Sequence, residues 1–142
     1  MKARNFFKIF VVTILILFAT INCRKKDNEI PSVAVNIDLD LNSVDFSVLN
    51  TVGNYVYVTG GAFGNGIVVY RRSIEEFKAY DRTCTYKPQQ GCRVKVDGIF
   101  ATDSCCGSQF LITDGSINKK PATIPLKEYS TVLNGTILHI YH

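Results

Sequence analysis

The stretch Val33-Ala34-Val35-Asn36-Ile37-Asp38-Leu39-Asp40-Leu41 alternates apolar and polar side chains along its whole length. A period of two places the apolar side chains on one face of an extended strand. Shorter runs rich in Val, Ile, Leu and Tyr lie at 55–58, 66–70, 93–96 and 136–140, and turn residues separate them. The sequence therefore predicts an all-β domain of short antiparallel strands.

The turns between these strands have recognisable sequences. The glycine-rich segment 60–66 predicts a hairpin and not a phosphate-binding loop, because no strand-to-helix junction accompanies it. Residues 96–99 (VDGI) and 133–136 (LNGT) predict two-residue hairpin turns of type I′. One short helix is expected at Ser73–Lys78, where Ser73 could cap the first turn.

The N-terminal residues 1–22 have the composition of a secretory signal peptide. Three basic residues precede an uncharged apolar run, which extends from Ile9 to Ala19 and is too short to favour a transmembrane helix. An uncleaved signal anchor is the alternative. The basic residues of this segment are Lys2, Arg4 and Lys8.

Thr20-Ile21-Asn22-Cys23 resembles a relaxed lipobox of the kind found in Bacteroidetes-type lipoproteins, although Asn22 stands where a smaller residue is usual. The resemblance implies lipidation of Cys23, and acyl chains would anchor the chain firmly in a membrane. Residues 23–32 are charged and turn-rich, as in a tether or a surface-export tag. The expected organisation is a signal peptide at 1–22, a lipidated tether at 23–32 and a domain at 33–142. The expected location is the cell envelope, with the outer membrane favoured and the face left open.

The charge of the chain argues against nucleic-acid binding. The formal net charge is +4, but after residue 22 the chain carries 13 basic and 12 acidic residues. A near-neutral domain lacks the basic surface that binding to phosphates requires. The expected partners are therefore the membrane, through the lipid, and an envelope protein that the sequence does not identify.

Four cysteines lie in the domain, and an exported domain with an even number of cysteines favours disulfides. Four cysteines allow three pairings. An all-cysteine metal site fits less well, because zinc sites usually contain a Cys-x2–4-Cys pair and Cys105 and Cys106 are adjacent. A redox-active bond between Cys105 and Cys106 is a further alternative, although Asp103 next to them would not favour a thiolate.

Two segments around the cysteines resemble the two boxes of Rieske iron–sulfur domains. Residues 80–86 (YDRTCTY) resemble the first box, which has a cysteine, any residue and a histidine after a strand that ends in an aromatic residue. Residues 104–110 (SCCGSQF) resemble the second box. The similarity covers about Tyr55 to the C-terminus. The later landmarks also follow in order, at Thr113-Asp114-Gly115, Lys120-Pro121-Ala122, Pro125-Leu126-Lys127-Glu128-Tyr129 and Asn134-Gly135.

The resemblance implies a Rieske-like fold of antiparallel sheets with a cluster-binding subdomain, but the ligand residues differ. A Rieske cluster is bound by two cysteines and two histidines. The positions equivalent to its ligands are Cys84, Tyr86, Asp103 and Cys106, so only Cys84 keeps the expected identity. The chain's histidines, His139 and His142, lie in or after the last predicted strand. No cofactor is expected, and a [2Fe–2S] cluster with atypical ligands is the alternative.

The resemblance also implies a pairing of the cysteines. Many Rieske domains have a disulfide between a cysteine after the first box and the middle cysteine of the second box, which here implies Cys92–Cys105. Cys84 and Cys106 would then face each other at the position of the cluster and could form a second bridge. If a metal were bound, its ligands would be Cys84 and Cys106.

No catalytic constellation is recognisable, so the protein is not expected to be an enzyme. The first functional hypothesis is an envelope-anchored lipoprotein whose Rieske-like domain has lost its cluster and serves a binding or structural role. The second is an electron carrier that retains a [2Fe–2S] cluster. The missing ligand histidines favour the first hypothesis.

Overall fold

The computed structural model describes residues 29–142, so the predicted signal peptide and Cys23 lie outside the described residues. A six-stranded sheet has the order β1-β10-β9-β4-β3-β2, and a four-stranded sheet has the order β5-β6-β7-β8. All pairings are antiparallel. The larger sheet consists of β1 (Asn36–Asp40), β2 (Tyr55–Val58), β3 (Ile67–Arg71), β4 (Phe77–Asp81), β9 (Glu128–Asn134) and β10 (Ile137–Tyr141).

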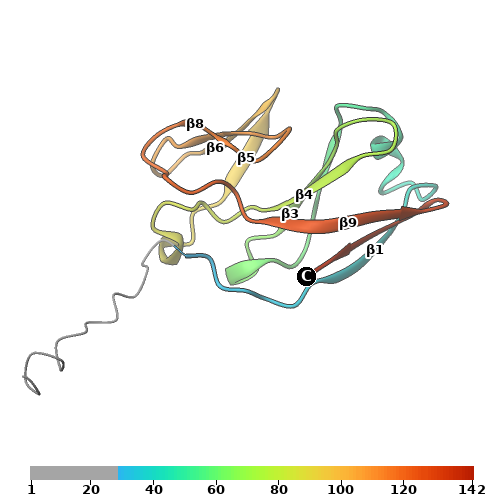
Figure 1. Ribbon diagram of the computed structural model, residues 1–142, viewed down its shortest axis with the longest axis horizontal. Coiled ribbons are helices and arrows are strands. Elements are labelled where there is room, and N and C mark those ends of the chain that lie inside the picture. The colour runs from blue at the N-terminus through green and yellow to red at the C-terminus, as the bar shows by residue number, and fades with distance from the viewer. Residues whose placement is uncertain (1–28) are drawn as a thin grey trace, which may run out of the picture.

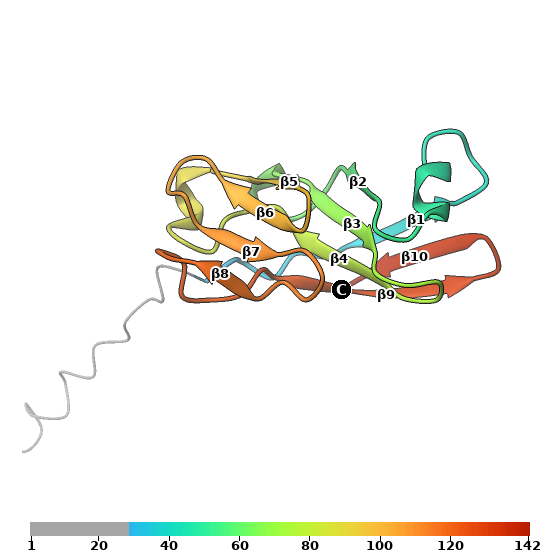
Figure 2. The same cartoon turned by 90° about the horizontal axis from the view of Figure 1, so that it is seen from above.

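The smaller sheet is an insertion between two neighbouring strands of the larger one. The chain leaves β4, forms β5 (Val94–Asp97), β6 (Phe100–Asp103), β7 (Gln109–Leu111) and β8 (Ile117–Lys119), and returns to pair β9 with β4. The two sheets form separate layers (Figure 1), and the smaller sheet covers one end of the larger (Figure 2). Short 3-10 helices occur at η1 (Ser47–Asn50), η2 (Ala62–Gly64) and η3 (Pro88–Gln90). The expected all-β class with antiparallel sheets and a smaller subdomain is confirmed.

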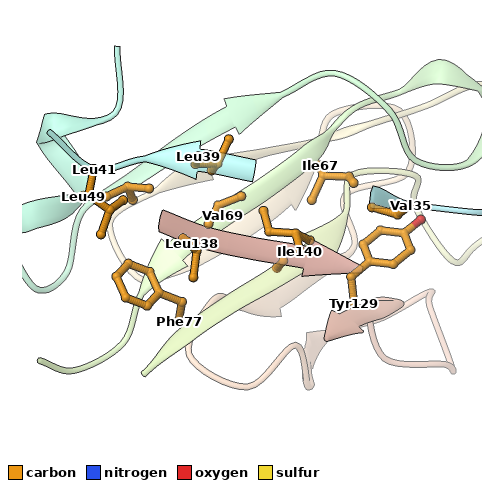
Figure 3. Close-up of a cluster of buried hydrophobic side chains, with 11 residues drawn as sticks. Val35, Leu39, Leu41, Leu49, Ile67, Val69, Phe77, Tyr129, Leu138 and Ile140 are labelled. Carbon is orange, nitrogen blue, oxygen red and sulfur yellow. The ribbon is translucent and has the colours of Figure 1, made fainter. Parts of the chain in front are cut away.

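Two hydrophobic cores lie on opposite faces of β3 and β4. The first four residues of β3 are apolar because Ile67 and Val69 point into one core while Val68 and Tyr70 point into the other. The first core packs β3 and β4 against β1 and β10, and Figure 3 shows its side chains. The second core packs β3 and β4 against the smaller sheet and contains Cys84. The central strand pair therefore fixes the inserted subdomain to the larger sheet.

The predicted helix at Ser73–Lys78 is wrong, because this segment forms the hairpin turn between β3 and β4. The N–H groups of Arg72 and Ser73 both donate to the carbonyl of Glu76, at 2.8 and 3.1 Å, and these bonds close the hairpin. The Ser73 hydroxyl does accept a bond from the Glu76 N–H at 3.1 Å. Phe77 is the first residue of β4 and is paired with Arg71 of β3, and its side chain is buried. A helix therefore cannot continue through this position.

The predicted hairpins form, but two of their turns differ in type from the expectation. The segment 60–66 connects β2 and β3 as a hairpin, closed by a bond from the Gly66 N–H to the Gly60 carbonyl at 2.9 Å. In the other two hairpins the central residues are 98–99 and 135–136, because Asp97 pairs with Phe100 and Asn134 with Ile137. Only the first central residue, a glycine, has positive φ, of 58° and 61°. This is the pattern of a type II′ turn and not of type I′.

No helix within residues 29–142 has the length and apolar character needed to cross a membrane.

Candidate functional site

The first box follows β4, and the buried carboxylate of Asp81 fixes its start. One oxygen of this carboxylate accepts the Thr83 N–H at 2.8 Å. The other accepts the Ala62 N–H at 2.5 Å and the Tyr129 hydroxyl at 2.6 Å. Asp81 thus ties β4 to the glycine-rich hairpin and to β9. Gly61 lies against this group, since a Cβ there would be 2.8 Å from Asp81 Oδ2.

A short ladder then directs Cys84 into the second core. The Val94 N–H donates to the Arg82 carbonyl at 2.7 Å, and the Cys84 N–H donates to the Cys92 carbonyl at 3.1 Å. The Arg82 guanidinium stacks over the ring of Tyr57 at 3.8 Å, which holds the box against β2. As a result, the side chain of Cys84 is fully buried.

The second box is the turn between β6 and β7. The Gly107 N–H donates to the Asp103 carbonyl at 2.8 Å, and Gly107 has a φ of 75°, which glycine adopts without strain. The Asp103 carboxylate is 1 % exposed, and its Oδ1 accepts the Cys105 N–H at 2.8 Å. The Ser108 hydroxyl oxygen accepts the Ala122 N–H at 2.9 Å, which connects the turn to the loop before β9.

A disulfide joins Cys92, which follows the first box, to Cys105 of the second box, so this predicted pairing is confirmed. The Cα atoms are 6.2 Å apart, which is within the usual range for a disulfide. The bond connects the segment just before β5 to the tip of the β6–β7 turn.

The bond predicted between Cys84 and Cys106 is not formed. Both residues are free thiols, and their sulfurs are 3.8 Å apart, whereas a disulfide requires about 2.05 Å. The two sulfurs do face each other, as the resemblance implied. The Cys106 Sγ instead donates a hydrogen bond to Asp103 Oδ2 at 3.0 Å.

The environment of Cys84 favours the protonated thiol. Burial is the main cause that raises the pKa of Cys84 well above its usual range, and the hydrogen bond to the Asp103 carboxylate adds to it. A neutral buried thiol is a poor nucleophile. Cys84 in this state is therefore not activated as a nucleophile.

The structure also places the other three predicted residues, Tyr86, His139 and His142. The ring of Tyr86 packs against the second core and faces the Lys87 ammonium at 5.2 Å. His139 lies in β10 and pairs with Asp38 of β1 at 2.5 Å. His142 follows β10 and contacts the Ser32 hydroxyl at 2.6 Å. Both histidines are thus on the larger sheet or at its end.

The donor atoms do not fit a Rieske cluster. The residues that could ligate are two thiols and one carboxylate, and histidine is absent from both boxes. The three donor atoms also lie within 4.8 Å of one another. A binuclear cluster separates the ligands of one iron from those of the other, whereas this spacing is typical of ligands around a single ion.

Two residues that organise the site had no predicted role of their own. Asp81 and Ser108 are fully buried, and each accepts backbone hydrogen bonds from a distant segment. The spacing Asp81-Arg82-Thr83 is compatible with a side chain that bonds to the backbone two residues ahead, which was a usable signal. The hydrogen bonds that these two residues accept from distant segments could not be predicted from a local sequence pattern.

No protein-family model matches the chain, and no curated protein matches it. Among solved structures it is similar to the plasma membrane Rieske protein of Synechocystis PCC 6803, with 24% identity, a TM-score of 0.49, and coverage of 59% of this chain and 84% of that chain. It is also similar to a ferredoxin of Sphingomonas yanoikuyae B1, with 20% identity, a TM-score of 0.47, and coverage of 66% and 92%. The ferredoxin of carbazole 1,9a-dioxygenase from Nocardioides aromaticivorans IC177 has 16% identity, a TM-score of 0.45, and coverage of 77% and 97%.

The buried ionisable groups predict a loss of stability at alkaline pH. Burial is the largest cause that raises the pKa values of Cys84, Tyr80 and Tyr129. In the unfolded chain these groups lose their protons near pH 8.5 for Cys and 10 for Tyr. In the folded state these groups keep their protons to higher pH. The free energy of unfolding therefore has its full value below about pH 8 and decreases as the pH rises further.

Urea unfolding of the reduced chain from pH 7 to pH 11 measures this effect. The slope approaches about 1.4 kcal/mol per pH unit for each group that is ionised only in the unfolded state. Tyr129→Phe removes one such group, so its slope above pH 10 is shallower than that of the native chain. A free energy of unfolding that stays constant up to pH 10.5 would contradict the burial of these groups.

Proposed function

We propose that this protein is an envelope-anchored lipoprotein whose Rieske-like domain carries no iron–sulfur cluster and serves a non-catalytic binding or structural role. The observation that carries the proposal is the set of side chains at the ligand positions of the two boxes. Their facing side chains are the thiols of Cys84 and Cys106 and the carboxylate of Asp103, and these donors do not match the ligand set of the cluster. The scaffold itself is retained through the second core and the Cys92–Cys105 disulfide.

Anaerobic reconstitution of the full chain with iron and sulfide tests the absence of the cluster. The expected result is a protein without the visible absorption bands and without the electron paramagnetic resonance signal of a reduced [2Fe–2S] centre. One cluster per chain would overturn the proposal and make the protein an electron carrier with atypical ligands.

A restored variant provides the positive control for the same experiment. Tyr86→His, Asp103→Cys and Cys106→His together recreate two cysteines and two histidines at the box positions. This variant is expected to take up a cluster under the conditions in which the native chain does not. If the folded variant also remains without a cluster, the assignment of these positions to the two boxes is contradicted.

The anchoring part of the proposal rests on Cys23 and the apolar segment before it. A lipidated cysteine keeps a protein on a membrane without a spanning helix. The native chain is expected to incorporate radiolabelled palmitate and to sediment with membranes, whereas Cys23→Ala incorporates no label. Labelling of the Cys23→Ala chain would refute the proposed lipidation site. We place the protein at the outer membrane, and separation of the two membranes on a density gradient tests this location.

A further inference from the structure

We propose that Cys84, Cys106 and Asp103 bind one divalent transition-metal ion, with zinc the preferred ion. The inference builds on the proposed function, because it requires the box positions to be free of a cluster. It assigns to those positions a mononuclear site, which contains neither sulfide nor a second metal.

The distances between the donor atoms match a single tetrahedral ion. Zinc binds thiolate sulfur at about 2.3 Å, so two sulfurs on one tetrahedral zinc lie about 3.8 Å apart. The sulfurs of Cys84 and Cys106 are 3.8 Å apart. Asp103 Oδ2 is 3.0 Å from Cys106 Sγ, and a shift of about 0.5 Å would bring it to the separation of an oxygen and a sulfur on the same ion. The three residues thus need little movement to become ligands.

The charge of the site favours a cation. Cys84 and Asp103 are buried, and the Asp103 carboxylate accepts hydrogen bonds from two neutral donors, the N–H of Cys105 and the thiol of Cys106. A buried carboxylate that neutral donors hold is costly compared with one that binds a cation. A divalent ion would supply the missing charge and would also stabilise the two thiolates. Two sulfur ligands and one carboxylate select zinc over the harder ions magnesium and calcium.

Binding involves deprotonation but no oxidation. The two S–H bonds ionise, their protons pass to the buffer, and two metal–sulfur bonds form, so up to two protons are released for each ion bound. Ser108 is placed to support the resulting thiolate. Its oxygen lies 3.0 Å from Cys106 Sγ and already accepts the Ala122 N–H, so its own proton can be donated to the sulfur. Cys106 is half-buried and leaves an approach from solvent, where a water can complete the coordination.

A second set of potential metal ligands lies nearby, but its two cysteines are bonded to each other. Cys92, Cys105 and Asp103 also lie within 4.8 Å of one another, but the first two sulfurs are bonded to each other. A disulfide sulfur is not a thiolate ligand. The disulfide therefore removes two of the cysteines of the domain from metal binding and leaves Cys84 and Cys106 as the pair that can ligate.

Cobalt and zinc titrations of the full chain in detergent test the proposal. All samples carry Cys23→Ser, so that Cys84 and Cys106 are the thiols available. Addition of Co²⁺ is expected to produce the ultraviolet thiolate-to-metal band and the visible bands of tetrahedral cobalt, saturating at one ion per chain, and Zn²⁺ is expected to displace it. A pH-stat records the release of up to two protons per ion.

Substitutions locate the site. Cys106→Ser and Cys84→Ser, each verified as folded by circular dichroism, are expected to lose the thiolate band and at least about 100-fold in zinc affinity, more than the loss from an outer-shell change. Asp103→Asn weakens binding, and the matched Asp97→Asn change at the exposed end of β5 leaves it unchanged. Ser108→Ala is expected to weaken binding by about 10-fold.

Two results would overturn the proposal. The first is a folded, reduced chain that shows no thiolate band with Co²⁺, and the second is a native chain in which Cys84 and Cys106 have formed a disulfide that excludes the ion. Either result leaves the absence of a cluster intact. Conversely, iron with acid-labile sulfide in the native chain would refute the proposed function itself, so the two failures are distinguishable.

Discussion

Asp81→Asn is expected to lower the free energy of unfolding by about 3 kcal/mol, because three buried donors depend on the Asp81 carboxylate. The Tyr129 hydroxyl and the N–H groups of Ala62 and Thr83 all donate to it, and Asp81 is fully buried. An asparagine replaces one acceptor oxygen by an NH₂ group, which cannot accept these bonds. At least one donor is then left without a partner in the interior. Denaturation in urea, followed by circular dichroism, measures the change.

The matched control for this substitution is Asp38→Asn on β1. Asp38 is exposed and contacts His139 on the neighbouring strand, and an exposed pair contributes up to about 1 kcal/mol. We therefore expect the control to change stability by less than a third of the Asp81→Asn effect. Equal effects of the two substitutions would show that Asp81 does not organise the first box.

Replacement of Cys92 and Cys105 by serine is expected to cost about 3 kcal/mol of stability. The sequence separation of 13 gives a closed loop for which the chain-entropy model predicts a contribution of this size. The loss also frees the tip of the β6–β7 turn from the segment before β5, so Cys84 and Cys106 are expected to become more accessible. Alkylation of the double variant by iodoacetamide is therefore faster than that of the native chain, and unfolding in guanidinium measures the stability.

Reductant distinguishes the two pairs of cysteines in the same experiment. Dithiothreitol is expected to destabilise the native chain to about the level of the double variant. It is expected to have no effect on the double variant, because Cys84 and Cys106 are thiols in the structure. A further loss of stability in the reduced double variant would reveal a Cys84–Cys106 bond and contradict the free-thiol state.

Several strands, the four-residue β2 and β5 among them, were predictable from a local apolar run or alternation, whereas β7 and β8 were not. The stretch 33–41 and the apolar run of β3 each give a local pattern that indicates a strand. Strands β7 and β8 have three residues each, which is too short for a periodicity to be visible. The segment around Ser73 looked like a helix start because its cap contact is local, but the burial of Phe77 in the first core decided the structure.

The residues of the candidate site were predictable from sequence, but the free-thiol state of Cys84 and Cys106 was not. The resemblance of the two boxes located Cys84, Asp103 and Cys106 and implied the Cys92–Cys105 bond. Whether Cys84 and Cys106 bond to each other depends on a third group. The buried Asp103 carboxylate accepts a hydrogen bond from the Cys106 thiol, and this contact depends on the shape of the β6–β7 turn, which no local sequence pattern predicted.

The measurement that tests the central claim most directly is the iron and acid-labile sulfide content of the full chain, isolated from an oxidising compartment and accompanied by its absorption spectrum. Our account predicts a folded, colourless protein without stoichiometric iron or sulfide and with the Cys92–Cys105 disulfide intact. Two irons and two sulfides per chain, with the visible bands of a [2Fe–2S] cluster, would contradict it and would show that these boxes bind a cluster without histidine.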